Sequence, residues 1–141
     1  MDTVDDRHFE RLYRQDDDPW RVATAWYERR KRAVLLATLA RERYGHVFEA
    51  GCGGGDMTLA LAQRCDQLCA VDLAPSALRR VQARLRADPV AAAVRTLALK
   101  LPQQWPPVPP GGFDLIVVSE LAYYCLLYTS PSPRDVEEYR M

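Results

Sequence analysis

The residues best suited to chemistry in this chain form a glycine-rich segment flanked by acids. Glu49 precedes residues 51–55, four of which are glycine, Asp56 follows them, and Asp72 ends the next apolar run. Glycine tolerates a positive φ and lets a ligand approach the backbone closely. A strand, a glycine turn, a helix, a second strand and an acid, in that order, are typical of half a nucleotide-binding unit. The pattern predicts a turn with free backbone N–H groups and an acid that accepts the hydroxyls of an adenosine ribose.

The acids beside the glycines distinguish two classes of ligand. A dinucleotide-binding GxGxxG motif needs a glycine at position 56, where this chain has Asp56. The carboxylates of Asp56 and Glu49 would repel a pyrophosphate at the same helix end. S-adenosylmethionine has no phosphate and carries a sulfonium and an ammonium group, so we interpret the turn as its site. A nicotinamide-dependent oxidoreductase and a non-catalytic Rossmann-like binding module are the alternatives.

Several segments together resemble class I S-adenosylmethionine-dependent methyltransferases. They are the ExGxGxG pattern of residues 49–55, the acid after the second strand, and residues 113–120. Residues 18–20, 26–31 and 119–124 are similar to the nodulation protein S-like branch, whose namesake N-methylates an amino sugar of a lipo-chitooligosaccharide. The resemblance covers roughly residues 8–124. It implies a Rossmann-like α/β fold with helices on both faces of a mostly parallel sheet, S-adenosylmethionine as the cofactor, and N-methylation of a small molecule.

The expected site lies at the carboxyl ends of the strands, where ligands bind in open α/β sheets. The expected cofactor-binding residues are Glu49, Gly51, Cys52, Gly53, Gly55, Asp72, Leu73 and Ser119. Glu120 follows the fourth strand and is the candidate catalytic residue, because an acceptor amine must lose a proton before it attacks; its alternative role is that of a solvated strand-end acid. Asp114 lies at the opposite end of that strand and is expected to be structural.

Apolar periodicity and turn residues predict where the elements lie. The expected helices cover residues 18–43, 56–64 and 75–86, and the expected strands cover residues 46–50, 68–72, 94–99 and 113–118. Asp18 is the expected N-cap of the first helix, and Gly45 is expected to end it. Trp20 and Tyr27 are interpreted as core residues of this helix rather than a lid over the cofactor. Residues 1–17 are polar, with Phe9 and Tyr13 as isolated apolar anchors.

Residues 101–112 contain five prolines, which exclude a crossover helix. In this fold class the third strand is at the edge of the sheet and the fourth lies beyond the first. The link between them must therefore cross two strands, a distance that an extended loop of this length easily spans. Trp105, within the loop, is expected to cover the sheet face beneath it.

Composition argues against several other classes of protein. The formal net charge is 0, which gives no electrostatic case for a nucleic-acid partner. No apolar run approaches the roughly 20 residues of a membrane span, and the acidic start lacks the apolar core of a secretory signal. Cys52, Cys65 and Cys69 form no C-x-x-C pair, which suits a reducing cytoplasm. His8 and His46 offer no spacing for a metal site.

The cysteines have separate expected roles. Cys52 lies in the glycine turn, where it could contact a ligand, whereas Cys65 and Cys69 are expected to be small buried fillers.

The final residues differ from everything before them. Residues 125–135 resemble the in-frame translation of a transposase-type sequencing adapter, and Pro131 and Pro133 exclude both a helix and a central strand. An ordinary proline-containing tail is the alternative. We expect an N-terminal cap and first helix over residues 1–44, an incomplete S-adenosylmethionine-binding core over residues 45–124, and a non-native tail over residues 125–141. On this interpretation the chain as it stands would not catalyse methyl transfer.

Overall fold

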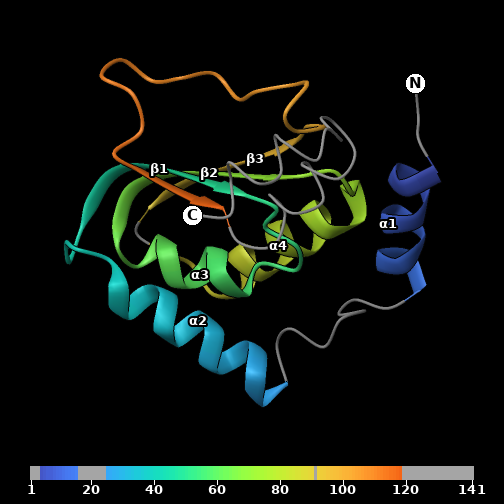
Figure 1. The fold of residues 1–141 in the computed structure, drawn as a ribbon, viewed down its shortest axis with the longest axis horizontal. Coiled ribbons are helices and arrows are strands. Elements are labelled where there is room, and N and C mark those ends of the chain that lie inside the picture. Colours follow the sequence, from blue (N-terminus) through green and yellow to red (C-terminus); the bar gives the residue numbers. More distant parts are fainter. Residues whose placement is uncertain (1–3, 16–24, 91, 119–141) are drawn as a thin grey trace, which may run out of the picture.

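The computed structural model describes residues 4–15, 25–90 and 92–118, which form a parallel four-stranded sheet with helices (Figure 1). In chain order the elements are α1 (Val4–Gln15), α2 (Trp26–Thr38), β1 (Tyr44–Ala50), α3 (Asp56–Ala62), β2 (Cys65–Asp72), α4 (Pro75–Ala87), β3 (Ala93–Ala98) and β4 (Leu115–Val118).

The strand order is β3-β2-β1-β4, which confirms the predicted order. All neighbouring strands are parallel, and the register places Ala50 at the end of β1 beside Val71 of β2 and Val118 of β4. The carboxyl ends of the strands therefore meet at one edge of the sheet. β1 is an inner strand, so the turn that follows it lies next to the ends of both neighbours.

One face of the sheet is covered by helices. Val47, Leu68 and Val117 on this face pack with Leu61 of α3 and with leucines of α2. Ala70 of β2 packs with Leu78 and Val81 of α4. Among the described residues, α2, α3 and α4 all pack on this face. Helices α3 and α4 bury apolar side chains against the alternate strand residues that point toward them, whereas α2 contributes only half-buried leucines.

The opposite face is covered by the proline-rich loop that joins β3 to β4, as expected (Figure 1). Phe48 is fully buried on this face, with Leu97, Leu99, Leu101 and Phe113 in the same cluster. The Trp105 ring meets the Phe48 ring edge-on, with centroids 5.1 Å apart, and remains half exposed. The prediction that Trp105 covers this face is therefore confirmed.

Asp114 is structural, as predicted. Its carboxylate accepts hydrogen bonds from the backbone N–H groups of Gly45 and His46, each 2.7 Å long. The hydrogen bond from Gly45 is the main cause that lowers the pKa of Asp114. The side chain thus ties the beginning of β4 to the beginning of β1, at the edge of the sheet away from the glycine turn.

The N-terminal region differs from the prediction in three ways. Residues 4–15 form α1, where only a polar segment was expected. The helix predicted over residues 18–43 ends earlier, since α2 covers Trp26–Thr38 and Leu39 has an extended backbone. Tyr27 is 63% exposed and so is not a core residue. Asp18 and Trp20 lie outside the described residues.

Hydrogen bonds from Arg64 account for the end of α2 after Thr38. Its guanidinium donates to the backbone carbonyls of Leu36 at 2.7 Å and Glu42 at 2.9 Å, and also to that of Arg41. The Arg64 carbonyl in turn accepts a hydrogen bond from the Tyr44 N–H. These contacts satisfy carbonyls that a continuing helix would have satisfied internally, and they direct the chain into β1.

We expect Arg64→Gln to reduce the free energy of unfolding by about 2 kcal/mol, because a charged donor serves three backbone carbonyls, of which that of Leu36 is partly buried. Urea denaturation monitored by circular dichroism measures the change. Arg64→Lys keeps the charge without the planar fork of donors and should recover only part of the loss. Full recovery by lysine would show that charge alone matters, contrary to this account.

Candidate functional site

The turn after β1 has the backbone that its glycines predict. Gly51, Gly53 and Gly55 have φ values of 76°, 54° and 95°. Gly55 is the N-cap of α3, and a Cβ atom there would lie 3.1 Å from Val81 Cγ2 of α4. Both the left-handed backbone and the close approach of α4 therefore require glycine at position 55.

Asp72 lies beside this turn, as predicted. Its Oδ2 atom accepts a 2.8 Å hydrogen bond from the Gly53 N–H, and Oδ1 accepts one of 3.0 Å from the Ala74 N–H. Burial raises the pKa of Asp72, while these hydrogen bonds act in the opposite direction. A carboxylate has about four acceptor positions, so room remains for further donors such as hydroxyls. Leu73 follows directly and is half-buried.

Glu49 is an internal residue rather than a surface acid. Its side chain is buried, and Oε1 accepts a 2.5 Å hydrogen bond from the hydroxyl of Thr58, which is fully buried in α3. Burial, with a smaller contribution from the charge of Asp72, raises the pKa of Glu49 to about 7. Glu49 thus links the end of β1 to α3.

Cys52 takes part in the turn through its backbone. Its N–H donates to the Val71 carbonyl at 3.0 Å. Its side chain is buried with Ala70, Leu78 and Val81, and burial raises the pKa of the thiol well above its usual value. A ligand in the turn would therefore meet the Cys52 backbone. Cys65 is fully buried, as expected, whereas Cys69 is only half-buried.

Asp56 has a partner that the sequence analysis missed. Its carboxylate lies 3.0 Å from Nη1 of Arg84, in the last turn of α4, and the same nitrogen donates to the Gly54 carbonyl at 2.9 Å. Asp56 therefore does not present the free charge that was expected to repel a pyrophosphate, and that prediction is wrong, because Arg84 compensates the charge. The available signal was spacing: Arg84 follows Val81 by three residues and so lies on the inward face of α4.

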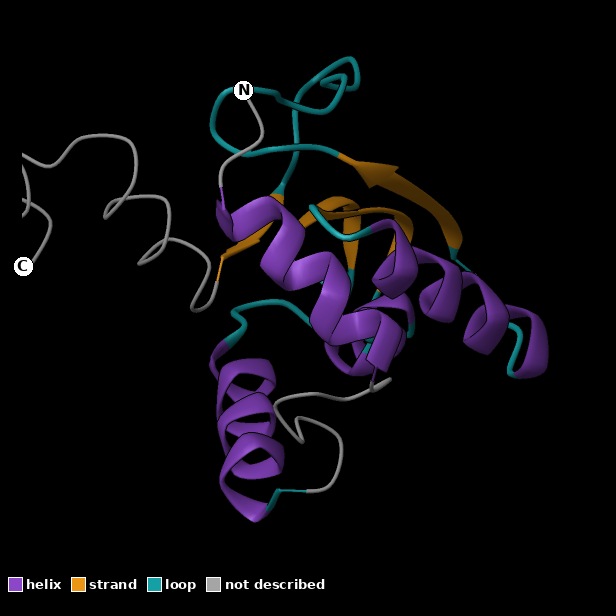
Figure 2. Ribbon diagram, turned by 90° about the vertical axis from the view of Figure 1, so that its right-hand side faces the viewer, coloured by secondary structure: helices purple, strands orange, loops and turns teal. Residues whose placement is uncertain are grey.

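Helix α1 lies over the carboxyl edge of the sheet, in front of the strands in Figure 2. Glu10 accepts hydrogen bonds from the hydroxyl and the N–H of Ser76, at 2.5 and 3.3 Å, and Asp6 pairs with Lys100 at 3.0 Å. A Cβ atom on Gly53 would lie 2.8 Å from the Tyr13 hydroxyl. Sequence reasoning missed these contacts because the partners lie far apart in the chain.

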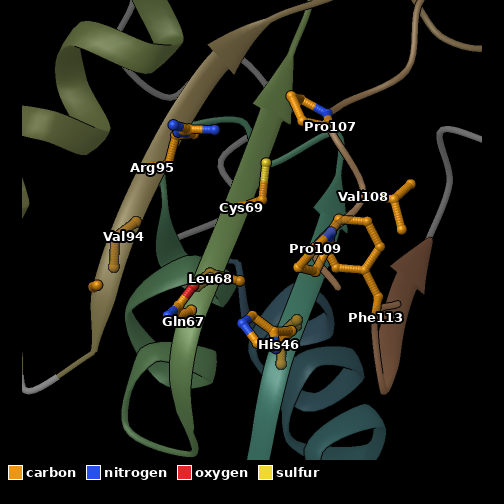
Figure 3. Close-up of a pocket in the computed structure, with 12 residues that line it drawn as sticks. His46, Gln67, Leu68, Cys69, Val94, Arg95, Pro107, Val108, Pro109 and Phe113 are labelled. Atoms are coloured by element: carbon orange, nitrogen blue, oxygen red, sulfur yellow. The ribbon is translucent and has the colours of Figure 1, made fainter. Parts of the chain in front are cut away.

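A groove of about 340 Å³ lies elsewhere, beneath the proline-rich loop (Figure 3). His46, Gln67 and Arg95 contribute polar groups, and Pro107 and Phe113 are among its apolar residues. These strand residues lie toward the amino ends of β1, β2 and β3 or midway along them. The groove is therefore distinct from the glycine turn, which is at the carboxyl edge.

The remaining predicted site residues, Ser119 and Glu120, lie outside the described residues. The same holds for Tyr123 and Tyr124, which end the segment 119–124 that carries part of the family resemblance. Within the described ranges, no group of three or more His, Cys, Asp or Glu side chains is placed to hold a metal ion. None of the described helices combines the length and the apolar character needed to cross a membrane.

Comparison with known proteins identifies the family. Residues 5–129 match the family described as nodulation protein S (NodS). The chain belongs to the nodulation protein S family. The match includes residues 125–129, which the sequence analysis assigns to a non-native tail and which lie outside the described residues.

Individual members of the family support this assignment. Nodulation protein S of Rhizobium tropici is 33% identical over 109 residues, which cover 77% of this chain and 43% of that protein. The protein of the same name from Sinorhizobium fredii is 33% identical over 113 residues, or 77% of this chain and 48% of that protein. The chain therefore spans about half the length of the curated relatives that it matches.

Solved structures agree with the fold. The N-methyltransferase NodS from Bradyrhizobium japonicum WM9, in complex with S-adenosyl-L-homocysteine, has a TM-score of 0.71 and 31% identity. The likeness covers 84% of this chain and 57% of that one. A putative methyltransferase from Pseudomonas syringae has a TM-score of 0.53 and 40% identity, over 73% of this chain and 65% of that one. The expected Rossmann-like methyltransferase fold is confirmed.

Glu49 makes stability depend on pH in a defined window. Its pKa is about 7 in the folded chain against 4.5 for the ordinary group. Between these values the folded chain keeps a proton that the unfolded chain has released. The tighter binding of this proton in the folded chain adds about 3 kcal/mol to the free energy of unfolding. This stabilisation is fully present below pH 4.5 and is lost as the pH rises to 7.

Glu49→Gln should remove this dependence, since glutamine stays neutral and still accepts the Thr58 hydrogen bond. The measurement is urea denaturation of both proteins from pH 4.5 to 8. The stability of the unmodified chain relative to Glu49→Gln should fall steadily across the window. A constant difference would show that Glu49 titrates at its ordinary pKa.

Proposed function

We propose that this chain is the cofactor-binding part of an S-adenosylmethionine-dependent N-methyltransferase that acts on a small molecule. Residues 45–124 would form the cofactor-binding core, and residues 1–44 would supply the helices beside it. The fold and the family support this assignment, and the NodS relative solved with S-adenosyl-L-homocysteine is an N-methyltransferase.

The observation that carries the proposal is the pairing of Asp72 with the glycine turn through the Gly53 N–H. The carboxylate is held at the end of β2 with unused acceptor positions. A ribose diol supplies two hydroxyl donors, so it fits this group. The backbone of residues 51–55 allows close approach, which suits the amino-acid half of the cofactor.

For methyl transfer, the main task of the protein is to position the methyl donor and the acceptor. The cofactor supplies an activated methyl group on a sulfonium, and a collinear arrangement of donor and acceptor provides most of the acceleration. Asp72 and the turn would hold the nucleoside and amino-acid halves, with Glu49 behind the turn. Glu120 remains our candidate to accept the proton of the amine, and Ser119 our candidate for a further cofactor contact.

The same hydrogen bond argues against the oxidoreductase alternative. In a dinucleotide site the glycine turn offers its N–H groups to a pyrophosphate. Here the Gly53 N–H already donates to Asp72, whose oxygen is only 2.8 Å away. A pyrophosphate bound here could not accept a hydrogen bond from the Gly53 N–H, and it would lie beside the carboxylate of Asp72.

The expected partner is a small-molecule acceptor, and the expected compartment is the cytoplasm. The free thiols of Cys52, Cys65 and Cys69 support a reducing environment.

Isothermal titration of the 141-residue chain with S-adenosyl-L-homocysteine tests the proposal. Asp72→Asn should weaken binding at least about tenfold, because it removes a charged acceptor of hydroxyl hydrogen bonds. Asp66→Asn is the matched control: Asp66 lies near the beginning of the same strand, at the opposite edge of the sheet, and its side chain is 65% exposed. It should leave the affinity unchanged.

Other outcomes identify the alternatives. Binding of NADH with no response to S-adenosyl-L-homocysteine would favour an oxidoreductase. Unchanged affinity in a folded Asp72→Asn protein would favour a binding module with a different site.

A further inference from the structure

Arg84 connects α4 to the glycine turn across a gap of 28 to 30 residues in sequence. Its side chain is 31% exposed and that of Asp56 is 13% exposed, so the carboxylate is largely shielded from water and the guanidinium is partly shielded. One nitrogen, Nη1, reaches both the Gly54 carbonyl and the Asp56 carboxylate. The contact therefore fixes the backbone of the turn and compensates a charge beside it.

The hydrogen bond to Gly54 acts on a peptide group inside the turn. The Gly54 carbonyl accepts from Arg84 at 2.9 Å, and the N–H of the same peptide, on Gly55, donates to the Cys52 carbonyl at 3.1 Å. This peptide is thus held on both sides. It joins Gly54 to the left-handed Gly55, where the backbone has the most freedom to reorient.

The ion pair with Asp56 acts on charge. Without Arg84, a largely buried carboxylate would stand next to the turn with no opposite charge. Electrostatic interactions are strong where water is excluded, so that carboxylate would repel the carboxylate of an amino-acid ligand. It would have little effect on a ligand that lacks this group.

We propose that Arg84 is a positioning residue for cofactor binding, which holds the Gly54–Gly55 peptide and neutralises Asp56 so that the turn accepts the amino-acid half of the ligand. The inference rests on the proposed function and extends it to a residue outside the glycine motif. Arg84 need not touch the ligand, because it acts through the turn and through Asp56.

Two ligands separate this role from a general effect on folding. S-adenosyl-L-homocysteine carries the amino-acid half, and 5′-methylthioadenosine lacks it. Arg84→Gln should weaken the binding of S-adenosyl-L-homocysteine about tenfold and change the affinity for 5′-methylthioadenosine by less than about twofold. The reason is that the lost charged hydrogen bond lies near the amino-acid half, which only S-adenosyl-L-homocysteine has. Arg84→Lys should restore part of the loss. Arg86→Gln is the control, because Arg86 is exposed and lies in the same turn of α4 as Arg84. This variant should change neither affinity.

Adding Asp56→Asn to Arg84→Gln should recover part of the affinity for S-adenosyl-L-homocysteine, because no unpaired carboxylate remains. Equal losses for both ligands, no loss for either, or a double variant no better than Arg84→Gln would overturn the role of Arg84.

Hydrogen exchange of the unliganded chain makes the test independent of the cofactor assignment. Arg84→Gln should speed exchange of the amides of residues 51–58 about tenfold while the β-sheet amides stay unchanged, because only the local opening of the turn becomes easier. Arg86→Gln should have no such effect. If the unmodified chain binds neither ligand, the proposed function fails; unchanged exchange in Arg84→Gln would overturn the positioning role itself.

Discussion

The hydrogen bond between the Gly53 N–H and Asp72 Oδ2 joins the two segments from which the candidate site is built. It links the turn after β1 to the end of β2, and it depends on the parallel register that places Ala50 beside Val71. The second oxygen of Asp72 accepts from Ala74, just before α4. Removing either donor would leave part of a buried carboxylate unsatisfied, which is costly. The turn, the strand end and the beginning of α4 therefore stabilise one another.

Each of the other acids near this edge has a partner of a different kind. Glu49 accepts from the Thr58 hydroxyl, Asp56 pairs with the Arg84 guanidinium, and Glu10 accepts from Ser76. Burial favours the neutral form of Glu49, and the charge of Asp56 is compensated. Asp72 has acceptor positions to spare at the strand end. This distribution suits a ligand with hydroxyl and ammonium donors better than one with phosphates.

The two faces of the sheet are covered by different means, and both depend on β1. Helices bury Val47 on one side, and the proline-rich loop buries Phe48 on the other. Next to Phe48 in the register is Ile116 of β4, which is 47% exposed. The loop therefore covers Phe48 more completely than it covers β4. Asp114 anchors the end of this loop to the beginning of β1.

The local pattern of the sequence was enough to predict the glycine turn, Asp72 at the strand end and the loop without a helix, whereas the strand order followed from the fold class that the family resemblance implies. Positive φ at glycine, the exclusion of helix by proline and the alternation of strand residues are properties of short segments. The helix over residues 4–15 was not predicted, because α1 packs against α4 through contacts such as that of Glu10 with Ser76, which lies 66 residues away in the sequence. The early end of α2 likewise depends on Arg64, whose partners precede it by more than 20 residues.

The sequence by itself therefore determined the backbone of the glycine turn and the place of Asp72 beside it. Only the tertiary structure decided which charges beside the turn are free and how accessible the turn is. Folding buried Glu49, compensated the charge of Asp56 through Arg84, and placed α1 over the strand ends. The physical reason is that the charge state and accessibility of a group depend on neighbours brought close by folding, which residue type and spacing do not specify.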